Sequence, residues 1–173
     1  LMSSPTNTLP PADRSIWETY RSLFWSVYAP GFLMSVCQGS VILIIPLFAL
    51  DLGASAAVTA LVFSLRGLGN MTADIPAGWA TGKFGDKTVM LLSVVLMAIS
   101  ALIASQANTT WQLGLAAFAF GAAVAGWLLA RLSHISEAVP VHQRGKAIST
   151  MAGVQRFGNL IGPATSGIVA QVY

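Results

Sequence analysis

Five long apolar stretches, separated by short polar connections, follow a polar and mixed segment at residues 1–23. The stretches run over residues 24–50, 57–80, 88–106, 111–135 and 145–172. A helix needs about 20 predominantly apolar residues to cross the hydrocarbon core of a bilayer, and each stretch has about this length or more. The pattern therefore predicts an all-α membrane protein with about five transmembrane helices.

Prolines occur inside several of these stretches, at Pro30, Pro46, Pro76 and Pro163. In a water-soluble helix each would break the backbone hydrogen-bond pattern. Transmembrane helices tolerate proline because neighbouring helices and local adjustments satisfy the freed backbone groups. We therefore expect the stretches to continue through their prolines.

Lysine and arginine residues alternate between the two sides of the predicted spans. The leading segment carries Arg14 and Arg21, the second–third connection carries Lys83 and Lys87, and the fourth–fifth connection carries Arg144 and Lys146. The connections at 51–56 and 107–110 carry none. Because cytoplasmic connections are enriched in these residues, we predict a multi-pass protein of the plasma (inner) membrane. Its N-terminal segment, residues 1–23, is expected in the cytoplasm.

The composition agrees with a lipid environment. Hydrophobic residues make up 55% of the chain and charged residues 9%, whereas soluble domains carry about 25% charged residues. The mean hydropathy is +0.71. The net charge of +3 does not indicate nucleic-acid binding, because the basic residues lie mainly at the ends of apolar stretches.

No residue pattern typical of catalysis is found. The sequence offers no Ser/His/Asp arrangement, phosphate-binding loop or paired carboxylates, and no metal-ligand spacing around its cysteine. His134 and His142 fall near the end of the fourth span and are interpreted as interfacial residues. We therefore expect no enzyme activity, no metal and no cofactor.

The connection after the second span carries the first family signature. Residues 78–87 read G-W-A-T-G-K-F-G-D-K, which resembles the loop signature G-x-x-x-D-R-x-G-R-R of the major facilitator superfamily. The positions that match in kind are Gly78, Lys83, Gly85 and Lys87. Two positions depart: Gly82 stands in place of the acidic residue, and Asp86 in place of the arginine after the second glycine.

A second signature lies in the fifth stretch, formed by Gly158, Gly162, Pro163, Ser166 and Gly167. It resembles the fifth-helix motif G-x-x-x-G-P-x-x-G-G, usually associated with antiporters. The preceding P-x-x-x-R-G-x-A, from Pro140 to Ala147, resembles the family's cytoplasmic connection. The family has twelve spans in two halves. The resemblance thus implies that this chain supplies five of the first six spans and that its partner is the C-terminal half of the same protein.

Each signature has two open interpretations. The loop is either a basic retention loop, with Gly82 and Gly85 supplying a sharp turn and its lysines contacting lipid head groups, or a conformational latch against the second half. The face of Gly158, Gly162 and Ser166 either packs against a neighbouring helix, as small residues allow in lipid, or seals one entrance against the second half.

Charges inside a membrane are costly and point to function. Arg66 and Arg156 lie near the middle of the second and fifth spans. They have either a structural hydrogen-bonding role or a substrate-binding role, and two buried cations favour an anionic substrate. Polar contacts are expected from Gln38, Asn70 and Gln155, and Asp74 is expected to pair with Arg131 or a loop lysine. The candidate binding or gating residues are Arg66, Asn70, Asp74, Gln155 and Arg156.

These features together predict a portion of a secondary active transporter. It would move a small solute, such as a drug, metabolite or organic anion, coupled to a proton or another ion, by alternating access around a midplane site. The alternatives are a membrane adaptor or structural protein that transports nothing, or a pseudogene product. A membrane enzyme is a further alternative, which lacks a visible catalytic cluster.

Overall fold

The computed structural model describes residues 29–172, without the side chains of 138, 142, 143 and 169–172. This part of the chain contains five helices and no strand. They are α2 (Ala29–Asp51), α3 (Ala56–Phe84), α4 (Asp86–Ser105), α5 (Thr110–Ala138) and α6 (Val141–Val172). The all-α prediction is therefore confirmed, whereas the predicted segment at residues 1–23 lies outside the described residues.

The helices extend beyond several predicted boundaries, most clearly around the second connection. The sequence predicts a loop after residue 80, but α3 continues to Phe84 and α4 begins at Asp86. Gly85, with a φ of 81°, makes the turn, and left-handed backbone of this kind favours glycine. Gly82 lies inside α3 and takes no part in the turn, so that part of the prediction is wrong. Pro46, Pro76 and Pro163 lie inside helices as predicted.

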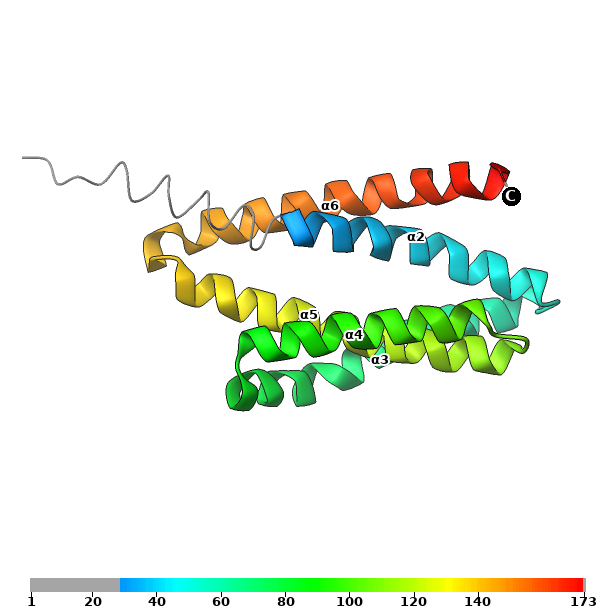
Figure 1. Ribbon diagram of the computed structural model, residues 1–173, viewed down its shortest axis with the longest axis horizontal. Coiled ribbons are helices and arrows are strands. Elements are labelled where there is room, and N and C mark those ends of the chain that lie inside the picture. Colours follow the sequence, from blue (N-terminus) through cyan, green and yellow to red (C-terminus); the bar gives the residue numbers. More distant parts are fainter. Residues whose placement is uncertain (1–28, 173) are drawn as a thin grey trace, which may run out of the picture.

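Two of the turns are defined by capping side chains. Ser55 precedes α3 and its hydroxyl oxygen accepts a hydrogen bond of 3.4 Å from the Val58 N–H. Thr109 precedes α5 and accepts a bond of the same length from the Gln112 N–H. Such caps satisfy N–H groups that have no partner within the helix. Because the connections are this short, consecutive helices run antiparallel (Figure 1).

The helices form two packed groups. In one, α5 packs against both α3 and α4; in the other, α2 packs along α6. Figure 1 shows α2 and α6 side by side, with the other three helices beneath them. Smaller contacts of α2 with α3 and α5, and of α6 with α5, join the groups.

The closest helix crossing is that of α3 and α5. A Cβ at Gly121 would collide with the carbonyl of Arg66 and lie 3.1 Å from the backbone nitrogen of Asn70. A Cβ at Gly69 would collide with the carbonyl of Phe118. Small residues at such positions let backbones approach in lipid, where helices associate through close packing. These glycines therefore fix where Arg66 stands relative to α5.

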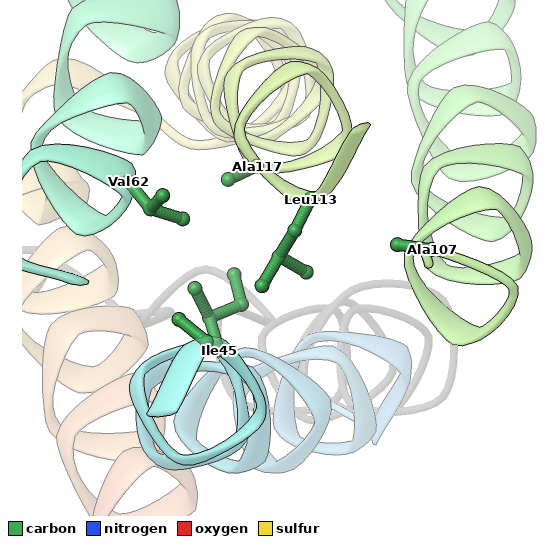
Figure 2. Packing of buried hydrophobic residues seen from close by; sticks show 6 residues of the cluster. Ile45, Val62, Ala107, Leu113 and Ala117 are labelled. Carbon is green, nitrogen blue, oxygen red and sulfur yellow. The ribbon is translucent and has the colours of Figure 1, made fainter. Parts of the chain in front are cut away.

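Apolar side chains fill the space between the two groups and also cover the outside. Ile45 of α2, Val62 of α3 and Leu113 of α5 point toward one another in one buried cluster (Figure 2). On the outside, Ile75 and Leu160 are exposed by 85% and 72%. An apolar exterior of this extent indicates a lipid-facing surface.

Length and composition alone mark three helices as able to span a membrane: Ala29–Asp51, Asp86–Ser105 and Thr110–Glu137. The other two, α3 and α6, have 29 and 32 residues and are more polar, with Arg66 and Arg156 among their charged residues. The protein is thus an integral membrane protein, and its two more polar helices carry the candidate site residues. That both cross the membrane stays a prediction.

Candidate functional site

Arg66 is the half-buried cation of α3. It lies about 15 Å from the start of that helix at 1.5 Å per residue, near the middle of a hydrocarbon core about 30 Å thick. Its guanidinium carbon is 5.8 Å from the centre of the Phe120 ring on α5. Its Nε is buried and has no hydrogen-bond partner among the described residues.

The energies show that this contact alone does not satisfy the charge. An arginine at the centre of a membrane helix costs at least about 2.5–3.5 kcal/mol. A cation–π contact returns about 0.5–2 kcal/mol, depending on how far it is desolvated. The Arg66 guanidinium therefore calls for a further hydrogen-bond acceptor.

Gln38 of α2 is the second unsatisfied donor. It is 4% exposed, and its Nε2 has no hydrogen-bond partner among the described residues. It shares a face of α2 with Met34 and Val41, at helical spacing, and both of these pack against the cluster that contains Phe120. Gln38 therefore faces the cluster that contains Phe120, whose ring also contacts the Arg66 guanidinium.

The remaining predicted binding residues differ in how far they are buried. Asn70, one turn further along α3, is half-buried, and Asp74 is exposed. On α6, Gln155 is half-buried and Arg156 is exposed. The predicted ion pair of Asp74 with Arg131 or a loop lysine is not formed in the described part of the chain.

The loop signature of residues 78–87 separates into two structures. At the end of α3, the Lys83 Nζ lies 4.6 Å from the centre of the Trp79 ring and 5.5 Å from that of Phe84. At the start of α4, the Asp86 carboxylate lies 3.9 Å from Nδ1 of His134 on α5. Gly78 and Lys87 are exposed. Asp86 thus faces a neighbouring helix of the same bundle, a contact that the sequence did not reveal.

The glycine signature of α6 packs against α2. A Cβ at Gly158 would lie 2.6 Å from Cβ of Ser35, and a Cβ at Gly162 would collide with the carbonyl of Val36. Pro163 has no N–H to bond the Asn159 carbonyl. That oxygen would lie 2.8 Å from a Cβ at Gly39. Helix packing within one bundle therefore accounts for the two glycines.

The far end of the signature remains accessible. A Cβ at Gly167 would have no described atom within 4 Å. Among the described residues, the Ser166 hydroxyl donates only to the carbonyl of Pro163, three residues earlier, at 3.0 Å. Contact of this end with a second half of the protein, as the sealing interpretation requires, stays a prediction.

Arg131 of α5, which the sequence suggests as a partner for Asp74, has instead a packing role. Its side chain is fully buried, and the guanidinium lies 4.8 Å from the centre of the Trp127 ring. The same guanidinium occupies the space beside Gly31, where a side chain on α2 would stand. Arg131 thus joins α5 to α2.

Long antiparallel helices, an apolar exterior and a half-buried arginine near the middle of α3 define a polytopic membrane protein that holds a cation within a largely apolar bundle. The sequence profile of the Major Facilitator Superfamily matches residues 28–173. The chain therefore belongs to this family, as its two signatures predicted.

Three relatives illustrate the similarity. The chain is 25% identical over 169 residues to the uncharacterized MFS-type transporter YfkF of Bacillus subtilis (strain 168), covering 94% of this chain and 42% of that protein. It is 28% identical over 169 residues to the multidrug resistance protein MdtG of Salmonella choleraesuis (strain SC-B67), covering 94% and 41%. It is 25% identical over 147 residues to the quinolone resistance protein NorA of Staphylococcus aureus (strain MRSA252), covering 84% and 38%. The chain spans about two fifths of the length of these curated relatives.

Proposed function

We propose that this chain is part of a secondary active transporter that moves a small solute across the membrane by alternating access. The proposal is supported by membership of the Major Facilitator Superfamily and by relatives named as a transporter and as drug-resistance proteins. The solute would be a drug, a metabolite or an organic anion, and its movement would be coupled to a proton or another ion. An antiporter mechanism fits the signature in α6.

The observation that carries the proposal is the state of Arg66. A half-buried guanidinium near the midplane, with an unpartnered Nε, suits a helix that lines a solute pathway, since intramembrane charges mark such pathways. A helix that only packs against other helices does not need a buried arginine, which costs free energy near the middle of the membrane. Five helices enclose no complete pathway, so the function requires the rest of a longer protein.

The proposed orientation follows from the basic connections. Lys83 and Lys87 at one turn, and Arg144 and Lys146 at another, would face the cytoplasm together with the N-terminal segment. The membrane would be the plasma (inner) membrane. The exposed Trp79 and Lys83 pair would then lie at the cytoplasmic lipid interface, where aromatic rings and basic side chains are favoured.

A flux assay tests the proposal. Protein made from the complete reading frame is reconstituted into liposomes, and labelled organic anions, metabolites and drugs are offered under an imposed proton gradient. We expect gradient-driven movement of at least one solute, abolished by a protonophore. The absence of any flux by folded protein, or equal flux by residues 1–173 alone, would contradict the proposal.

The second candidate is a membrane adaptor that binds partners without transporting. The reading frame separates the two directly. About seven further spans after Tyr173 support a transporter, whereas a stop codon there supports the adaptor or a pseudogene product.

A further inference from the structure

Two hydrogen-bond donors without acceptors among the described residues lie within about one helical turn of each other in depth. Arg66 stands about 15 Å and Gln38 about 20 Å from the helix ends that the 51–56 connection joins, at 1.5 Å per residue. The Arg66 Nε and the Gln38 Nε2 are both buried, and neither donates a hydrogen bond to a described residue. Buried polar groups are nearly always hydrogen-bonded, so each donor indicates an acceptor that the bundle does not itself supply.

Phe120 connects the two donors. The Phe120 ring is 6% exposed and contacts the Arg66 guanidinium. It also belongs to the cluster against which Met34 and Val41 pack, and these two residues flank Gln38. Phe120 and Val41 also line a largely apolar cavity of about 280 Å³ between α2, α4 and α5, whose lining does not include Arg66 or Gln38. A cavity of this kind suits the apolar part of a small ligand.

The distribution of charged residues favours a negatively charged ligand. Of the four acidic residues in the described part of the chain, three stand at or beside a helix end: Asp51, Asp86 and Glu137. The fourth, Asp74, is exposed and two turns away from Arg66. No described carboxylate therefore competes for the Arg66 guanidinium near the midplane.

We propose that Arg66 and Gln38 bind the carboxylate of a small organic anion, with the apolar body of the anion against Phe120. This inference rests on the proposed transport function and names its substrate class. Guanidinium is suited to the planar, two-oxygen geometry of carboxylates, and the Gln38 amide supplies a neutral donor that fixes orientation. Arg156, which is exposed on α6, lies outside this site, so one arginine rather than two sets the preference for anions.

Three aromatic probes of one shape and different charge test the inference: benzoate, benzamide and benzamidine. Their effects on the thermal unfolding of purified protein, made from the complete reading frame, give their dissociation constants. We expect benzoate to bind at least tenfold more tightly than benzamide, and benzamidine not to bind. Equal binding of the three, preference for benzamidine, or no binding of benzoate would overturn the inference.

Four variants localise the binding. Arg66→Gln and Gln38→Met each remove a donor at nearly constant volume, and each should weaken benzoate binding about tenfold, since a hydrogen bond to a charged group is worth roughly that factor. Arg66→Lys keeps the charge but not the planar fork, and should fall between Arg66→Gln and the unmodified protein. Arg156→Gln is the matched control and should bind benzoate unchanged.

The outcome is separable from that of the flux assay. Benzoate binding that depends on Arg66 and Gln38, without flux of any solute, keeps the site and rejects the transport function. Flux of solutes with no anion preference, unaffected by Arg66→Gln and Gln38→Met, keeps transport and rejects the site. If one substitution prevents folding, shown by the loss of the unfolding transition without ligand, the other three variants still test whether the carboxylate binds at this site.

Discussion

The hydroxyl of Ser40 on α2 donates a hydrogen bond of 2.9 Å to the carbonyl oxygen of Gly162 on α6. The same hydroxyl also donates to Val36 of its own helix at 3.1 Å. A side-chain hydroxyl reaches a backbone carbonyl on another helix only where the two backbones are close. Gly162 permits this, because a Cβ there would stand 2.7 Å from the Ser40 backbone nitrogen.

Gly162→Ala should therefore destabilise the protein. The added methyl group meets backbone atoms of α2, which cannot rotate away, and overpacking of this kind costs about 1–3 kcal/mol. Thermal unfolding in detergent measures the effect. The matched control is Gly167→Ala on the same helix, where the methyl group meets nothing within 4 Å and the unfolding temperature should not fall, since alanine favours a helix over glycine. Equal changes in the two variants would show that the α2–α6 contact is not as close as described.

Arg131→Lys should also destabilise, although the charge is kept. Lysine lacks the planar guanidinium that lies over the Trp127 ring, and its compact ammonium is more strongly hydrated. We expect a loss of about 1–2 kcal/mol, the value of a desolvated cation–π contact, measured by chemical unfolding in detergent. Arg156→Lys makes the same chemical change at an exposed position. If Arg131→Lys were no more harmful than that control, Arg131 would not join α5 to α2.

The proposed orientation predicts which connections react from which side. Cysteines are introduced one at a time at exposed positions into protein that carries Cys37→Ser. Lys87→Cys and Lys146→Cys should react with a membrane-impermeant maleimide only from the cytoplasm. Ser55→Cys and Asn108→Cys should react only from the opposite side. Intact cells and oriented vesicles allow labelling from each side separately. Reaction of either pair of cysteines from the opposite side would contradict the proposed orientation.

The helices themselves could be predicted because their signals are local. The signals are the apolar stretches, the short connections and the positive-inside alternation, and each depends on nearby residues alone. The turn at Gly85 is also indicated locally, because glycine favours this backbone conformation. Around residues 80–88 the polar signature suggests a loop, although its residues continue two helices.

The partners of individual side chains could not be predicted, because they depend on which helices pack together. Nothing near Gly31 in the sequence indicates that the Arg131 guanidinium fills the space beside it, or that Asp86 meets His134. Arg66 could be singled out because a charge inside an apolar stretch stands out by itself. Gln38 carried a weaker signal, and its importance rests on its burial and its unpartnered Nε2.

Accessibility of the bundle interior from both sides of the membrane tests the central claim most directly. Asn70→Cys, one turn from Arg66 and half-buried, is placed in the complete protein with Cys37→Ser, and reaction with an impermeant thiol reagent is measured from each side in turn. Leu61→Cys, which is exposed on the apolar surface of α3, is the control and should react from neither side. Alternating access predicts that Asn70→Cys reacts from both sides. Reaction from one side only, or from neither, would contradict the account.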